Sequence, residues 1–246
     1  VTIKDANNCT ATTIVTITQP TLLTATTSAT AISCNAGQST ITVTANGGTT
    51  AYQYKLNAGA YQVSNIFSNN NAGTYTITVQ DANNCTTTTT VTIVQPTALT
   101  LSASATVILC NPGTSTITAT AGGGTTAYQF SLNGGAYQSG NTFSGNGPGT
   151  YTITVKDANN CTKTSTVSIT QPNVLSVTAS AGSILCNGGN TTITATGTGG
   201  TTSYQFSLNG GTYQAGTSFT NVVAGSYTVT IKDANNCTAT TIVTIT

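Results

Sequence analysis

The sequence repeats itself at one fixed interval, and this constrains the fold more than any other feature. The heptapeptide "KDANNCT" at 4–10 returns at 80–86, 156–162 and 232–238, with Gln in place of Lys in the second copy. Each copy follows the previous one by 76 residues, and such strict self-similarity is the signature of a tandem array. A period of this length suits one small independent domain. We therefore predict a row of similar domains.

The domain limits follow from Gln-Pro pairs that recur at the same interval, beginning at Gln19-Pro20. The predicted parts are the C-terminal part of a truncated repeat at 1–19 and three full repeats at 20–95, 96–171 and 172–246. Because residues 1–18 and 229–246 are identical, we expect a segment of a longer array whose larger unit is three domains. Short connections that contain proline are stiff, which favours an extended rod.

Apolar and polar residues alternate within each repeat, as in β-strands with one buried and one solvated face. One long strand is expected to bury Leu99, Leu101, Ala103, Ala105, Val107 and Leu109. The sequence "LNGG" at 132–135 and 208–211 places Asn-Gly where a tight hairpin needs positive φ at both central residues. The heptapeptide is predicted to form a second hairpin tip, because Asp and Asn side chains bond nearby backbone groups in turns. Its Asp residues are Asp5, Asp81, Asp157 and Asp233.

About seven short strands per repeat, with a turn about every 8–12 residues, indicate a β-sandwich. The predicted fold class is all-β: tandem immunoglobulin-like β-sandwich domains with a 76-residue period, arranged as an extended rod. Tyr75, Tyr151 and Tyr227 open the penultimate strand. This is the position of a tyrosine corner, where the hydroxyl bonds back to the chain. A plain core tyrosine is the alternative.

The cysteines also recur at the repeat interval, two per repeat plus one from the truncated repeat, which accounts for all 7. Regularly spaced cysteines in small exported domains are typical of disulfides. We favour pairing within each repeat, which staples a small domain internally: Cys34–Cys85, Cys110–Cys161 and Cys186–Cys237.

An immunoglobulin-like strand path favours a different pairing of the same cysteines. In such a path, the first turn and the last hairpin tip lie at opposite ends of the sandwich. Their separation exceeds the roughly 7 Å between Cα atoms that a disulfide allows. The alternative therefore joins neighbouring repeats through Cys34–Cys161 and Cys110–Cys237, and it leaves Cys9, Cys85 and Cys186 to pair with repeats outside the chain.

Composition argues against several functional classes. Only 4% of residues are charged, against about 25% in typical soluble domains, and the usual general bases His and Glu are missing. We therefore expect no enzyme, no catalytic residue and no cofactor. A net charge of +1 without a basic cluster argues against nucleic acid, and no apolar run reaches the roughly 20 residues of a membrane span.

Metal binding is not expected either. A calcium site at "DANN" would have a single carboxylate per repeat, whereas calcium sites usually gather several oxygen ligands. A zinc site would lack both His and a CxxC motif. The simpler interpretation of this sequence is a hairpin tip shaped by Asx turns.

Three stretches of the last repeat resemble a known family. "CNGGNTTITATGTGG" at 186–200, "YQFSLNGG" at 204–211 and "AGSYTVTIKDANNCT" at 224–238 are similar to the SprB repeat of large cell-surface adhesins of gliding Bacteroidota. The resemblance covers all three full repeats and the partial first one. It implies type IX secretion, display as surface filaments and, in some members, gliding motility, with no active-site motif. Family members often have acidic loops that this chain lacks, so another filament role stays open.

Two functions remain open on the sequence. In the first, the array is a structural stalk or filament segment of an extracellular adhesin at the cell surface, and it contacts neighbouring repeats and other copies in a filament or bundle. In the second, the repeat surface binds carbohydrate or ice through the alternating Thr of "TYTITV" and "CTTTTTVTIV" and through Tyr61, Tyr137 and Tyr213. Alternating Thr also suits the solvated face of any strand, which favours the first function.

Overall fold

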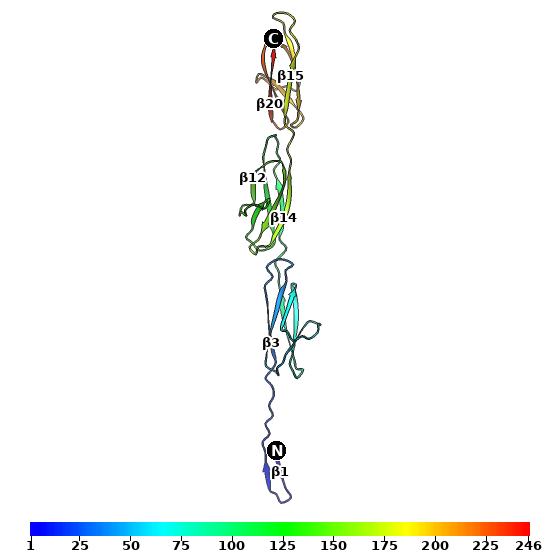
Figure 1. The fold of residues 1–246 in the computed structure, drawn as a ribbon, viewed down its shortest axis with the longest axis vertical. Helices are drawn as coiled ribbons and strands as arrows, with labels where there is room; N and C mark the ends of the chain where they lie inside the picture. Colours follow the sequence, from blue (N-terminus) through cyan, green and yellow to red (C-terminus); the bar gives the residue numbers. More distant parts are fainter. The chain divides into compact units, whose positions relative to one another are not determined.

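A computed structural model describes all residues from 1 to 246, and they form strands and turns without a helix. The chain divides into two compact units, Val1–Ala98 and Leu99–Thr246. The first unit holds a short hairpin and one β-sandwich, and the second holds two β-sandwiches (Figure 1). No segment forms a helix long and apolar enough to cross a membrane.

The strands follow the 76-residue period closely. The first unit contains β1 (Thr2–Lys4), β2 (Thr10–Thr12), β3 (Thr24–Ala29), β4 (Ser39–Asn46), β5 (Gln53–Leu56), β6 (Ile66–Asn70), β7 (Gly73–Gln80) and β8 (Thr86–Ile93). The next sandwich contains β9 (Thr100–Ala105), β10 (Ser115–Gly122), β11 (Gln129–Leu132), β12 (Thr142–Asn146), β13 (Gly149–Lys156) and β14 (Thr162–Ile169). The last contains β15 (Ser176–Ala181), β16 (Thr191–Thr198), β17 (Gln205–Leu208), β18 (Ser218–Val222), β19 (Gly225–Lys232) and β20 (Thr238–Ile245).

Each sandwich consists of two three-stranded antiparallel sheets. In the first unit the strand orders are β3-β4-β6 and β5-β7-β8, and the other two sandwiches repeat this arrangement. The first strand of one sheet, β3, packs beside the last strand of the other, β8. Two antiparallel sheets whose strands alternate between the layers in this way form an immunoglobulin-like sandwich. The predicted all-β fold class is confirmed.

The core of each sandwich lies between the two central strands, one from each sheet. In the first unit Ile41 and Val43 of β4 face Ile77 and Val79 of β7, and all four are 0% exposed. Their polar neighbours point outward, because side chains alternate between the two faces of a strand. Burying an aliphatic side chain of this size stabilises the fold by about 1.5–3 kcal/mol. The two-residue period of the sequence therefore accounts for the buried layer.

The sandwich has six strands in each repeat, fewer than the sequence suggested. In the second unit, Asn133 and Gly134 both have positive φ, and the Gly135 amide donates to the Leu132 carbonyl at 2.9 Å, which forms the expected Asn-Gly turn. The returning chain pairs with β11 only where Gln138 and Phe130 exchange two backbone hydrogen bonds. One isolated bridge does not make a strand, so the seventh strand is missing.

The predicted long strand from Leu99 to Leu109 is also shorter than expected. Strand β9 ends at Ala105, and beyond it Val107 and Leu109 are 78% and 54% exposed. Ile108, which was expected to face solvent, is buried and packs into the core. The alternation fails here because the chain leaves the ladder after Thr106, whose amide bonds the Thr116 carbonyl.

The tyrosine corner is present in all three sandwiches. The Tyr151 hydroxyl donates to the Gly147 carbonyl at 3.0 Å. Tyr75 and Tyr227 make the same bond to the residue four positions upstream, also at 3.0 Å. The tyrosine corner was therefore the correct alternative.

Candidate functional site

The Asp side chain of the repeated heptapeptide organises the hairpin that carries the cysteine. Asp233 lies between β19 and β20, is 3% exposed, and accepts three backbone hydrogen bonds on its carboxylate. Its Oδ1 atom accepts from the amides of Asn235 and Cys237, both at 2.9 Å, and its Oδ2 atom accepts from the Thr201 amide at 2.8 Å. The carboxylate thus fixes the cysteine backbone to the loop between β16 and β17, which connects the two sheets.

The same arrangement recurs at Asp81 and Asp157, and it affects their titration. The hydrogen bond from the Thr49 amide is the main cause that holds the pKa of Asp81 below its usual value. At Asp157, burial pushes the pKa upward, but the amides of Thr125 and of the hairpin itself outweigh it and lower the pKa. Hydrogen bonds to the charged form favour ionisation. Because amide protons surround these carboxylates, they are not arranged to bind a cation.

Asp5 lies in the separate hairpin formed by β1 and β2. Its Oδ1 atom accepts from the amides of Asn7 and Cys9, both at 2.9 Å. Its backbone amide donates to the Cys9 carbonyl at 3.0 Å. The heptapeptide therefore forms the same turn in this hairpin as in the sandwiches.

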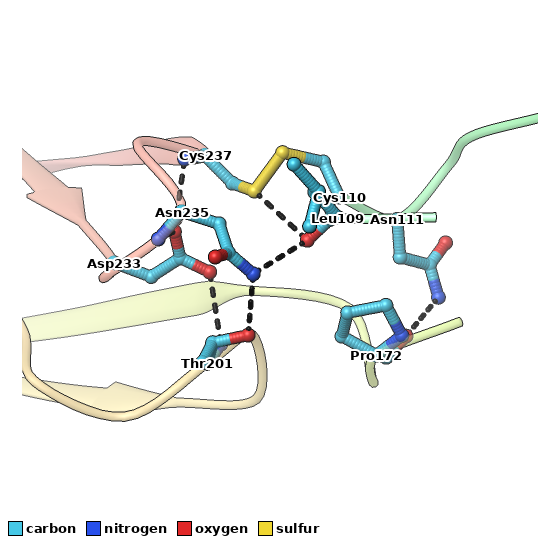
Figure 2. Close-up of a disulfide and its surroundings, with 8 residues drawn as sticks. All are labelled: Leu109, Cys110, Asn111, Pro172, Thr201, Asp233, Asn235 and Cys237. Atoms are coloured by element: carbon cyan, nitrogen blue, oxygen red, sulfur yellow. Dashed lines mark hydrogen bonds between the residues drawn. A yellow bond between two sulfur atoms is a disulfide. The ribbon is translucent and has the colours of Figure 1, made fainter. Parts of the chain in front are cut away.

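In the second unit, the hairpin of the last sandwich is joined to the preceding sandwich by a disulfide. Cys110, which follows β9, is bonded to Cys237, with 5.7 Å between the Cα atoms (Figure 2). This distance lies within the usual range for disulfides. The Asn235 side-chain amide donates to the Leu109 carbonyl at 3.2 Å and to the Thr201 hydroxyl at 2.8 Å. Leu109 and Cys110 therefore receive both the side chain and the sulfur of one hairpin.

The loop that carries Cys110 also holds the connection between the two sandwiches. The Asn111 side-chain amide donates to the Pro172 carbonyl at 3.0 Å (Figure 2). In the first unit, Asn35 makes the same bond to the Pro96 carbonyl at 2.9 Å. There the Ala36 amide also donates to the Gln95 side chain at 2.9 Å. The second unit lacks this extra bond because its equivalent residue is a proline without an amide proton.

The pairing within each repeat, which the sequence favoured, is wrong. Cys110 bonds Cys237 rather than Cys161, and Cys85 and Cys186 are free thiols, as is Cys9. The physical reason is the strand path: the cysteine after the first strand and the cysteine of the last hairpin lie at opposite ends of one sandwich. The equivalent link one repeat earlier, Cys34–Cys161, stays a prediction.

The exposed tyrosines that were considered as sugar-stacking residues each lie beneath a lysine. The Lys156 ammonium lies 4.5 Å from the ring centre of Tyr137, and Lys232 lies 4.4 Å from that of Tyr213. In the sandwich of the first unit, the heptapeptide has Gln80 at the Lys position, and Lys55 of strand β5 takes its place over Tyr61 at 4.9 Å. The tyrosine thus keeps a cation–π contact in every sandwich.

Several residues of this junction were not singled out in the sequence. They are the first Asn of the hairpin, represented by Asn235, the Thr201 backbone, and the Asn that follows the loop cysteine, represented by Asn111. Their recurrence in every repeat was visible, but the turn alone seemed to explain it. Only the contact between two sandwiches gives them a separate role.

Comparison with known proteins yields structural resemblances only. No protein-family model matches the chain. No curated protein matches it either. The five N-terminal immunoglobulin domains of Sidekick-1 are 9% identical over 93% of this chain and 59% of that chain, with a TM-score of 0.37.

Two further solved structures show the same degree of similarity. The eight N-terminal immunoglobulin domains of DSCAM are 13% identical over 89% of this chain and 33% of theirs, with a TM-score of 0.35. Invasin, a bacterial integrin-binding protein, is 16% identical over 92% of this chain and 60% of its own, with a TM-score of 0.31. The chain therefore spans less than two thirds of each, and its fold assignment rests on the strand order.

Proposed function

We propose that this chain is a structural segment of a long repetitive extracellular adhesin, in which successive sandwiches are fastened into a stiff stalk. The observation that carries the proposal is the disulfide between Cys110 of one sandwich and Cys237 of the next. This disulfide restricts the rotation of one sandwich relative to the next, and restricted rotation is the property that a stalk needs.

Two hydrogen bonds support the disulfide in this role. Asn235 bonds the Leu109 carbonyl beside it, and Asn111 bonds the Pro172 carbonyl of the connecting segment. The connection itself contains Gln171-Pro172, and proline fixes one of its two backbone dihedral angles. The junction is thus restrained through the hairpin, the loop and the connecting chain. A flexible linker would instead be rich in Gly and Ser.

The location and the finer identity are parts of the same proposal. Disulfides persist in oxidising surroundings, which supports an extracellular protein. The resemblance to the SprB repeat supports attachment to the surface of a gliding bacterium and export by the type IX route. We propose no catalytic role, because the hairpin carboxylates are occupied by backbone amides.

A ligand-binding surface is the second candidate, and one feature of the first unit favours it. On the outer face of its β7-β8 hairpin, Thr74, Thr76 and Thr78 pair with threonines of β8 and form two parallel columns. The last sandwich does not have the same columns of threonine. In the last sandwich an exposed isoleucine, Ile242, stands opposite Thr228. A regular binding lattice would need the same face in every repeat, so the structural role is the better supported one.

Small-angle scattering on arrays of two, three and four repeats tests the stalk directly. The proposal predicts that the maximum dimension grows linearly with repeat number under oxidising conditions. Growth with the square root of repeat number would mean flexibly joined beads and would refute it. Thermal hysteresis or glycan binding by the full chain would favour the second candidate.

A further inference from the structure

The last sandwich carries a loop that matches the one holding Cys110. Residues 184–189, "ILCNGG", lie 76 residues after 108–113, "ILCNPG". In the earlier loop, Leu109 and Cys110 receive the hairpin of the following sandwich. In the later loop, Cys186 is an exposed free thiol. The second unit therefore contains two loops of nearly the same sequence, one bonded to a hairpin and one with a free thiol.

Loop 184–189 is closed by a turn of its own. The Gly189 amide donates to the Cys186 carbonyl at 2.9 Å, which closes the turn. The loop at Cys34 closes in the same way, with the Gly37 amide 3.0 Å from the Cys34 carbonyl. Ile184 anchors the turn by packing against the core of the last sandwich. No contact with a further domain is needed to form this geometry.

A hollow of about 420 Å³ lies beside loop 184–189. It is lined by Ile184, Leu185 and Cys186 from the loop and by Val223, Ala224 and Thr246 from the same end of the sandwich. The Leu185 side chain is 92% exposed, whereas Leu109 in the bonded loop is 54% exposed. Leu185 and Cys186 at the edge of this hollow correspond to Leu109 and Cys110, which contact the hairpin in the bonded loop.

We infer that loop 184–189 is a socket for the Asp-Ala-Asn-Asn-Cys hairpin of a further repeat. Cys186 forms a disulfide with the cysteine of that hairpin, and the Leu185 carbonyl accepts a hydrogen bond from the side-chain amide of the first Asn. The inference rests on the Cys110 junction and on the proposed function, which it deepens by naming the partner of loop 184–189. Socket and hairpin are different surfaces, so each added repeat brings a new socket as well as the hairpin that fills the previous one.

The covalent step is ordinary thiol–disulfide exchange with a small disulfide oxidant such as oxidised glutathione. The Cys186 thiolate attacks the oxidant and forms a mixed disulfide, releasing one reduced thiol. The hairpin thiolate then attacks the Cys186 sulfur, forms the new disulfide and releases the second thiol. Two protein thiols are oxidised and one oxidant disulfide is reduced.

The test compares the full chain with a chain extended by a second copy of residues 171–246, both kept in a glutathione redox buffer. In the extended chain, we expect peptide mapping without reduction to find Cys186 bonded to the cysteine of the added hairpin. Cys186 should then resist alkylation, whereas it is alkylated readily in the 246-residue chain. The Cys110–Cys237 peptide in the same digest reports correct folding. Free Cys186 in a digest that contains this peptide would overturn the inference.

A second variant separates seating of the hairpin from the disulfide itself. With Ser in place of the cysteine in the added hairpin, the socket is still covered, so alkylation of Cys186 should be several-fold slower than in the 246-residue chain. An equal rate would reject the socket. Neither failure would refute the stalk proposal, because that proposal depends on the Cys110–Cys237 disulfide and is tested separately by scattering.

Discussion

The side-chain amide of Asn235 reaches across to the preceding sandwich and donates to the Leu109 carbonyl at 3.2 Å, directly beside the Cys110–Cys237 disulfide. The same amide group donates to the Thr201 hydroxyl of its own sandwich at 2.8 Å. The Asn235 side chain therefore bonds both to its own sandwich and to the preceding one. The stalk that we propose therefore depends on this junction rather than on a pocket or a charged surface.

Replacing Asn235 with alanine should loosen the junction without unfolding either sandwich. A net hydrogen bond contributes about 0.5–1.5 kcal/mol, and Asn235→Ala removes two. We expect faster reduction of the Cys110–Cys237 disulfide by dithiothreitol, measured by mass spectrometry. The matched control is Asn7→Ala, at the same position of the separate β1-β2 hairpin, which should leave the reduction rate unchanged. If both variants behave alike, Asn235 has no role at the junction.

Removing the disulfide should uncouple the two sandwiches of the second unit. The double variant Cys110→Ser/Cys237→Ser is expected to lose about 2–4 kcal/mol of stability, the usual range for a native disulfide. Urea unfolding followed by circular dichroism should show that loss. Cys186→Ser removes a free thiol and is the control, with unchanged unfolding. A double variant as stable as the parent would mean that the link contributes nothing.

The hairpin carboxylates should make the fold sensitive to acid. Because the folded-state pKa values of Asp81 and Asp157 are lowered, their contribution is fully present above the unfolded pKa of about 3.9 and is lost as pH falls through the folded value. We therefore expect stability to be nearly constant from about pH 7 to 5 and to fall below about pH 4.

The variants Asp81→Asn and Asp157→Asn should each be less stable at neutral pH and should flatten this acid response. Urea unfolding at a series of pH values measures both effects. Lys163→Gln removes an exposed charge that contributes no hydrogen bond to the Asp81 or Asp157 carboxylate, so this variant should keep the parent's pH dependence. If a variant that carries both Asp81→Asn and Asp157→Asn still loses stability steeply in acid, other groups cause the loss.

The lysine above the tyrosine comes from a different strand position in the first sandwich, Lys55, than in the second, Lys156, and this difference allows a test of the cation–π contact. Lys55→Ser removes the ammonium above Tyr61 and should destabilise the first unit by about 0.5–1 kcal/mol. Adding Gln80→Lys restores the arrangement seen at Lys156 and Tyr137 and should recover the loss. Urea unfolding of the full chain measures both steps. Failure of the second substitution to rescue the first would show that Lys55 acts in another way.

Sequence periodicity predicted the sheets well, because the spacing of Ile41, Val43, Ile77 and Val79 follows directly from the alternation of side chains in a strand. It failed where the chain leaves a ladder, as at Val107 and Ile108. It also overcounted the strands, since Gln138 makes only one bridge to Phe130. Local pattern does not reveal where pairing stops.

The disulfide pairing was likewise predictable only in part. Recurrence identified Cys110 and Cys237 as disulfide candidates, but choosing between their partners required the path of the strands between them. The preference for a link within each repeat came from a general expectation about small domains. The structure follows the path instead, and it pairs cysteines 127 residues apart. The roles of Asn235 and Asn111 depended on that pairing and could not be predicted before it.

The bond between the two sandwiches of the second unit can be checked by mass spectrometry of the alkylated, non-reduced chain after trypsin digestion. We expect a cross-linked species that joins the peptide containing Cys110 to the C-terminal peptide containing Cys237, with Cys186 alkylated. A Cys186–Cys237 or Cys110–Cys161 species in its place would contradict it.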